Sequence, residues 1–480
     1  MKKYNTLFVV IFTVLFVALL SWILPITYLN GTFITDPRAP MGLTDIFTYP
    51  TFLIYNFIYV FIYVLLVGGF YAVLNKTGAY RQILDGLVKF LKGKEIIFAS
   101  IAVLLISVIV SFTGFTYEAI IIFPFIIAIV LMLGYDKITA ALMTLGPVVT
   151  GIMGSTFSKM VNGTYNGVLN ANGAVVEYTD LIWAKLAVIV ITNILLVVYI
   201  IVYNLIYRKK TDVSNVEENI FVPEKSEVVV KKWPLITILA ITLVIIVIST
   251  LNWADAFQIT VFTDWLEKIK ELTIGGYDIW AKLLGTMVAF GNWTYNELMV
   301  FLFVIILIIK LVYRVKFEEL FDAIFDGMKN YLYAAGIMLL AYAVLIATSN
   351  HPVILTILKP LLVVGEEFNS LFLGLKLALS TFISALFSTD FGFHNYTVLP
   401  LSYVTSYIND TTMYAVCALI TQMMNGLAIL VAPTSIVLLF SLSSLKITYL
   451  EWLKRIGLLF LAFLVVSVAT LIIVLLIIWE

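Results

Sequence analysis

Three ionisable residues stand in segments that are otherwise apolar enough for a lipid bilayer: Glu118, Asp390 and His394. A carboxylate in that setting can exchange a proton, coordinate sodium or meet a cationic solute group. An imidazole, with an ordinary pKa of about 6.5, can carry a proton or donate one to a carboxylate. Charges inside a membrane are costly and usually face a cavity or a partner, so all three are candidate binding residues. The alternative is that Glu118 and His394 pair with each other, or with backbone, and only hold the two segments together.

Two similar segments, 111–124 and 387–400, carry these residues at matching positions. Their alignment places Thr113 on Thr389, Phe115 on Phe391, Tyr117 on Phe393, Glu118 on His394 and Pro124 on Pro400. The match predicts an internal duplication.

The composition is that of a membrane protein. Of 480 residues, 62% are hydrophobic and 12% charged, against about 45–50% and about 25% in soluble domains. The formal net charge is zero and the basic residues are spread along the chain, so nucleic acid is not an expected partner. The single Cys417 excludes an intramolecular disulfide and a cysteine-based metal site.

Apolar runs predict an all-α polytopic fold. The expected spans are 5–28, 51–75, 95–110, 118–133, 138–153, 182–207, 233–251, 298–314, 330–348, 369–387, 391–405, 412–440 and 456–479. The first is too long for a typical signal-peptide core, so we expect an uncleaved span. Most of the 29 basic residues fall in loops that can all be cytoplasmic, which predicts a multi-pass protein of the cell (cytoplasmic) membrane with its N-terminus inside.

Under this assignment the two halves run in opposite directions. The spans 51–75 and 330–348 share Tyr-Ala-Val-Leu, have opposite orientations, and each precedes one of the polar segments. This pattern indicates two inverted-topology repeats. The expected parts are a first span with an external loop (1–50), repeat 1 (51–207), a cytoplasmic linker (208–232), a connecting span with an external amphipathic segment or packed loop (233–297) and repeat 2 (298–480).

The arms beside the first polar segment are short for membrane spans. Residues 95–110 and 118–133 would each form about 24 Å of helix, against a hydrocarbon core of about 30 Å. We therefore expect a re-entrant hairpin, matched by a second one at 369–387 and 391–405. Irregular backbone inside a membrane requires protein or water to satisfy it, so such tips imply a cavity. The alternative is two ordinary spans joined by an external turn.

Each polar segment is followed by a span with helix breakers. Residues 146–163 contain several Gly and Ser residues with Pro147, and 425–435 contains Asn425-Gly426 and Pro433. A broken helix exposes amides at one new end and carbonyls at the other, which suits ion or carboxylate binding. Alternatively, the small residues only permit close helix packing. Lys159 either pairs with a substrate carboxylate or extends to a surface.

Together, these features give one set of candidate substrate- or ion-binding residues: Ser111, Thr113, Tyr117, Glu118, Gly154, Ser155, Thr156, Lys159, Ser388, Thr389, Asp390, His394, Asn395, Asn425, Pro433, Thr434 and Ser435. A coupling sodium ion is expected near Ser155, Thr156, Thr434 and Ser435; a proton is the alternative. No cofactor is expected, because the sequence has no phosphate-binding glycine-lysine loop and no zinc motif.

The stretch Gly68 to Ala79 resembles a motif of YfcC-like permeases, relatives of the DcuC-type C4-dicarboxylate carriers of the ion transporter superfamily. Leu133-Gly134-Tyr135-Asp136, Gly154-Ser155-Thr156 and Pro433-Thr434-Ser435 agree with that family in order. The resemblance implies inverted repeats with re-entrant hairpins, frequent homodimers, and transport of small carboxylates or amino acids. Both hairpin tips depart from the family pattern, with Glu118 replacing paired acids and 387–394 replacing a Pro-Ser-Gly-Ser-Gly-Gln-like run.

We therefore expect a secondary active transporter for an amino acid or a C4-dicarboxylate, coupled to ions or to counter-substrate. A channel with re-entrant loops is the main alternative. A membrane-embedded hydrolase would need a catalytic arrangement such as Ser388 with His394.

Overall fold

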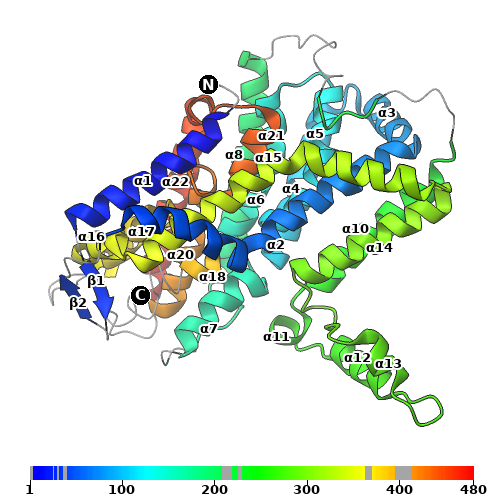
Figure 1. Ribbon diagram of the computed structural model, residues 1–480. Helices are drawn as coiled ribbons and strands as arrows, with labels where there is room; N and C mark the ends of the chain where they lie inside the picture. The colour runs from blue at the N-terminus through cyan, green and yellow to red at the C-terminus, as the bar shows by residue number, and fades with distance from the viewer. Residues whose placement is uncertain are drawn as a thin grey trace.

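The computed structural model describes residues 4–24, 26–29, 32–35, 40–171, 173, 175–207, 219–224, 230–362, 370–394 and 413–479. Within these residues, eight helices are long and apolar enough to cross a membrane, with shorter apolar helices between them (Figure 1). The predicted all-α polytopic fold is confirmed. A two-stranded antiparallel hairpin follows the first helix, with Ile26 paired to Thr35 and Leu29 to Thr32.

The helices of the first half are α1 (Asn5–Ile23), α2 (Leu43–Lys76), α3 (Ala79–Leu91), α4 (Glu95–Thr113), the 3₁₀ helix η2 (Tyr117–Ile121), α5 (Phe123–Met132), α6 (Lys137–Met153), the π-helix η3 (Lys159–Gly163), α7 (Thr164–Ala171) and α8 (Ile182–Tyr207). The strands are β1 (Ile26–Leu29) and β2 (Thr32–Thr35). The predicted first span of 5–28 is therefore too long, since its helix ends at Ile23.

A connecting part follows, with α10 (Trp233–Thr250), α11 (Trp253–Phe257), α12 (Val261–Glu271) and α13 (Ile279–Leu284). The second half holds α14 (Tyr295–Tyr313), α15 (Phe317–Asn350), α16 (Val353–Leu362), α17 (Ser370–Ala385), α18 (Phe391–Phe393), α20 (Met413–Ile429), α21 (Ile436–Leu445) and α22 (Tyr449–Trp479). Figure 1 shows α10 and α14 together, leading to α11, α12 and α13, which project from the rest.

The two longest helices, α2 and α15, pack against each other in opposite directions. Tyr49 and His351 share a hydrogen bond of 2.7 Å, and the backbones meet further along at Gly68 and Gly327. A β-carbon on Gly68 would lie 2.6 Å from the Gly327 carbonyl oxygen, so only glycine allows this approach. Each helix has 34 residues, which makes the predicted spans of 51–75 and 330–348 too short.

The first hairpin lies beside α6. The Ser107 and Thr150 hydroxyls share a 2.7 Å hydrogen bond, and Ser111 Oγ donates to the Gly154 carbonyl at 2.8 Å, so α4 and α6 run in the same direction. The intervening α5 must therefore return towards the end where α4 begins. Its 10 residues give about 15 Å of helix, about half of a hydrocarbon core. The predicted arm 95–110 is too short, because α4 has 19 residues and continues to Thr113. That the tip of the hairpin lies inside the membrane stays a prediction.

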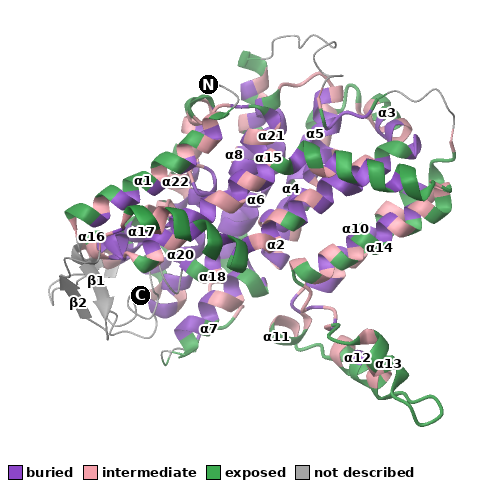
Figure 2. Ribbon diagram, in the orientation of Figure 1, coloured by how far each residue is buried: buried purple, intermediate pink, exposed green. Residues whose placement is uncertain are grey.

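Both predicted helix interruptions are present. The first separates α6, which ends at Met153, from η3 and α7. The second separates α20 from α21, so the predicted span 412–440 is two helices. Figure 2 shows α6 buried, whereas α12 and α13 are largely exposed. Residues 395–405 of the second predicted hairpin and most of the predicted linker 208–232 lie outside the described residues.

Candidate functional site

Two neighbouring cavities share Met160 and Thr164 in their walls; the first lies between the two halves, and the second lies mainly between the first half and the connecting part. We name the first, of about 490 Å³, the tyrosine cavity; it is lined by Tyr59, Gly114, Thr116, Tyr117, Met160, Thr164, Tyr295, Thr389, Asp390, Phe391, Gly392, Phe393, Ile429, Ile436 and Val437. The second, of about 400 Å³, we name the lysine cavity; it is lined by Thr113, Phe115, Glu118, Lys159, Met160, Gly163, Thr164, Tyr178, Thr250, Asp255, Gly291, Asn292, Trp293, Thr294 and Leu298.

Glu118 is 3% exposed and lines the lysine cavity from η2. Its carboxylate accepts a hydrogen bond of 3.1 Å from the Thr116 amide, and Tyr63 Oη donates to its backbone carbonyl at 2.8 Å. The tip is set by Gly114, which ends α4 with φ of +77°, a left-handed conformation that favours glycine. A β-carbon on Gly114 would also lie 2.9 Å from Cβ of Met160, so the tip packs directly on η3.

Asp390 lines the tyrosine cavity from the second polar segment. Its carboxylate caps the short helix α18 by accepting from the Phe393 amide at 3.2 Å, and Tyr342 Oη donates to it at 3.3 Å. Glu118 and Asp390 therefore line two cavities that adjoin at Met160 and Thr164. The fold thus brings together two acids from segments that are far apart in sequence.

Each polar segment is bonded to the interruption that follows it. In the first half, the Thr156 amide donates to the Ser111 carbonyl at 3.0 Å. In the second half, Thr434 Oγ1 donates to the Leu386 carbonyl at 3.0 Å. The first contact joins two backbone groups, whereas the second is made by a side-chain hydroxyl.

The two interrupted helices also contact each other through buried amides; Asn425 was among the predicted site residues, whereas Gln422 and Asn162 were not. Gln422 Nε2 donates to the carbonyls of Met153 and Ser155 at 3.1 and 3.0 Å, and Gln422 Oε1 accepts from Asn162 Nδ2 at 3.0 Å. Asn425 Nδ2 donates to Tyr165 Oη at 2.8 Å. The available signal was the presence of Gln422 in an otherwise apolar stretch and of Asn162 beside Gly163 in the interrupted segment.

Lys159 extends from η3 towards the connecting part. Its ammonium donates to Asn292 Oδ1 at 2.6 Å and lies 3.5 Å from Asp255 Oδ2. Tyr178 lines the lysine cavity together with Lys159, and partial burial raises the pKa of its phenol. The Lys159 side chain is 47% exposed, so it reaches a surface between η3 and the connecting part and is paired there.

Several of the predicted binding residues line the two cavities, and others do not. Thr113, Tyr117, Glu118, Lys159, Thr389 and Asp390 line one or the other cavity. His394 lines neither; it is fully buried and shares a 2.8 Å hydrogen bond with Ser384. Asn395 lies outside the described residues.

The hydroxyls near which sodium was predicted make hydrogen bonds within the protein. Ser155 Oγ donates to Asn162 Oδ1 at 2.6 Å, Thr156 Oγ1 lies 3.1 Å from Ser111 Oγ, and Ser435 Oγ accepts from the Leu438 amide at 3.3 Å. These hydroxyls are not among the residues that line the two cavities. Sodium binding stays a prediction. Among the described residues, no group of three or more His, Cys, Asp or Glu side chains forms a metal site.

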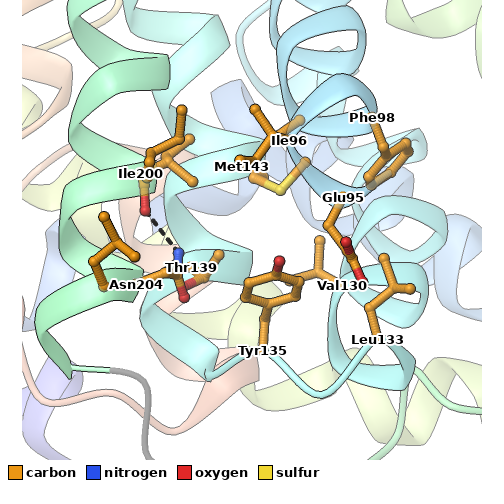
Figure 3. Close-up of a pocket in the computed structure, with 13 residues that line it drawn as sticks. Glu95, Ile96, Phe98, Val130, Leu133, Tyr135, Thr139, Met143, Ile200 and Asn204 are labelled. Carbon is orange, nitrogen blue, oxygen red and sulfur yellow. Dashed lines mark hydrogen bonds between the residues drawn. The ribbon is translucent and has the colours of Figure 1, made fainter. Parts of the chain in front are cut away.

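A third cavity, of about 140 Å³, lies where α4 and α6 begin and α5 ends. Figure 3 shows Glu95 and Tyr135 near apolar side chains such as Met143 and Ile200, with Asn204 Nδ2 donating to the Ile200 carbonyl at 2.7 Å. Small-molecule sites usually have about 300–1,000 Å³. The tyrosine and lysine cavities are therefore the better candidates for a solute site.

The protein is an all-α integral membrane protein with carboxylates beside internal cavities. Solute transporters share this architecture. A family model described as DcuC, the C4-dicarboxylate anaerobic carrier, matches residues 5–476, and the chain belongs to this family. It is a membrane transporter and not an enzyme.

Other similarities are more distant. An uncharacterized protein of Haemophilus influenzae is 28% identical over 122 residues, and this match covers 25% of the chain and 23% of that relative. The YdaH transporter of Alcanivorax borkumensis shares 13% identity with a TM-score of 0.38, covering 98% of this chain and 97% of its own. MtrF of Neisseria gonorrhoeae shares 11% identity with a TM-score of 0.36, covering 98% and 94%. The sequence identities and TM-scores of these matches are too low for any property of a binding site to be inferred from them.

Proposed function

We propose that the protein is a secondary active transporter of a small carboxylate-bearing metabolite, an amino acid or a C4-dicarboxylate, coupled to sodium, protons or counter-substrate. Membership of a carrier family supports transport of this class of solute. The observation that carries the proposal is the placement of Glu118 and Asp390 on adjoining cavities beside the two interrupted helices.

In this mechanism the solute occupies the adjoining cavities, and movement of the two halves relative to each other exposes it to alternate sides of the membrane. Lys159 offers a cationic partner to a solute carboxylate. Glu118 and Asp390 offer negative charge to a proton, a sodium ion or a cationic group.

The test is uptake by the purified protein in proteoliposomes. We expect Glu118→Gln to abolish uptake or to uncouple it from the ion gradient while membrane insertion is unchanged, because the variant removes a charge with little change of shape. Glu267→Gln, at an exposed position on α12, is the matched control and should behave as wild type. Unchanged coupled uptake by the Glu118 variant would remove this residue from the mechanism.

Substrate identity can be narrowed by thermal-shift measurements with amino acids and dicarboxylates, each with and without sodium. A ligand that binds only the native state raises the unfolding midpoint by mass action. Saturable uptake with counterflow indicates a carrier, whereas steady single-channel currents would indicate a channel. We also propose a homodimer in the cell membrane with the N-terminus inside; light scattering of the detergent-solubilised protein measures the oligomer.

A further inference from the structure

We infer that the tyrosine cavity is the subsite for an ammonium group, so that the transported solute is an amino-acid-like zwitterion or cation rather than a C4-dicarboxylate. This inference rests on the proposed transport function and names its substrate class.

The first argument is the cluster of three tyrosine rings in the cavity wall. The rings of Tyr59 and Tyr295 stack with centroids 3.9 Å apart and planes 8° apart. The ring of Tyr117 lies 6.4 Å from that of Tyr59 and 6.1 Å from that of Tyr295. These residues come from α2, η2 and α14, so the cluster is assembled by the tertiary fold and is not the stripe of a single helix. Aromatic faces attract ammonium groups within about 6 Å of the ring centroid.

The second argument is the charge of the same wall. The described residues that line the tyrosine cavity include one acid, Asp390, and no Lys or Arg. Glu118 lines the adjoining lysine cavity and brings a second carboxylate next to this wall. A dianion placed here would meet like charge without a cationic partner, whereas an ammonium group would meet a carboxylate and aromatic rings.

The third argument is the arrangement of the two cavities. The tyrosine cavity adjoins the lysine cavity at Met160 and Thr164, and Lys159 is the cation among the described residues that line either one. A zwitterion can therefore place its ammonium group beside Asp390 and direct its carboxylate towards Lys159, in exchange for the 3.5 Å contact of that lysine with the exposed Asp255. A volume of about 490 Å³ is adequate for such a small solute.

The experiment compares ligands that differ at the ammonium group, using the full-length protein in detergent and calorimetry or thermal shift as the readout. The probes are the twenty L-amino acids, the N-acetyl derivative of each one that binds, and succinate and fumarate. We expect at least one amino acid to bind, its N-acetyl derivative to bind at least about tenfold more weakly, and the dicarboxylates to give no shift. Equal binding of the free and N-acetylated forms, or preferential binding of succinate or fumarate, would overturn the inference.

Two variants locate the interaction. Asp390→Asn keeps a good helix cap and should weaken amino-acid binding at least about tenfold by removing a charge-assisted contact. Tyr295→Leu, at the half-buried first residue of α14, should weaken it by about threefold or more. The matched control is Tyr277→Leu, since that tyrosine is 69% exposed and lies outside the cavity wall. Unaltered amino-acid affinity in both Asp390→Asn and Tyr295→Leu would contradict the assigned subsite.

Transport measurements separate this inference from the proposed function. Counterflow of radiolabelled succinate without counterflow of any amino acid would leave the transporter proposal standing and overturn the ammonium subsite. Single-channel currents without saturable exchange would overturn the transporter proposal itself, and the inference with it. Saturable counterflow of an amino acid supports both.

Discussion

At the scale of single residues, the contact between the two interrupted helices depends on Gln422. This side chain is fully buried, and its amide satisfies the Met153 and Ser155 carbonyls exposed where α6 ends, while its oxygen accepts from Asn162. Water is excluded from this position, so these backbone groups depend on the protein for their hydrogen bonds.

We expect Gln422→Leu to destabilise the protein, because each buried polar group left without a partner costs about 1–3 kcal/mol. The measurement is the thermal unfolding midpoint in detergent. Thr421→Val on the same helix is the control, since among the described residues Thr421 bonds to the Cys417 carbonyl of its own helix turn, and loss of this bond should cost less. Equal midpoints for the two variants would show that the Gln422 contacts are not important for stability.

Glu118 and Gln422 illustrate what residue type alone can reveal. A carboxylate in an apolar segment is costly enough that a functional setting could be predicted from sequence. A neutral glutamine carries a weaker signal, and its partners come from a helix more than 250 residues away. His394 resembled Glu118 by position, yet the fold turns it towards Ser384 and away from the cavity walls.

At the scale of elements, the crossing of α2 and α15 is governed by glycine. Gly68 and Gly327 let the two backbones approach more closely than any side chain permits. Helices α2 and α15 both continue beyond the apolar run that hydropathy detects, into ends that carry charged residues such as the half-buried Asp45 and the exposed Glu318. Hydropathy therefore underestimated the length of both helices.

We expect Gly327→Ala to lower the unfolding midpoint, since the added methyl carbon would lie 2.7 Å from Cβ of Ala72 and overlap the Gly68 carbonyl. Overpacking of this kind typically costs about 1–3 kcal/mol. Gly336→Ala is the control on the same helix, because nothing lies within 4 Å of its added carbon and alanine favours helix. A Gly327 variant as stable as the Gly336 variant would contradict the tight crossing.

At the scale of the whole molecule, orientation in the membrane is a prediction from the distribution of Lys and Arg. Lys92 follows α3 in the basic segment 76–95, which is predicted to be cytoplasmic, and Lys268 lies on α12 in the predicted external segment; both are exposed. In a Cys417→Ala background, Lys92→Cys and Lys268→Cys each supply one accessible thiol.

We expect an impermeant maleimide to label Lys268→Cys in intact cells and Lys92→Cys only after permeabilisation, because basic loops are retained inside. Wild type, whose single Cys417 is buried, should remain unlabelled in both conditions. The reverse labelling pattern would require the orientation to be inverted.

The sequence by itself determined the class of fold, the places where helices break and the acidic residues worth examining. Those properties depend on local chemistry: hydrophobicity over about 20 residues, the conformational preferences of Gly and Pro, and the cost of a charge in lipid. The tertiary structure alone decided that Tyr59, Tyr117, Tyr295 and Asp390 share a cavity and that Gln422 joins the two interrupted helices. Such contacts join distant segments, and their geometry depends on how every helix between them packs.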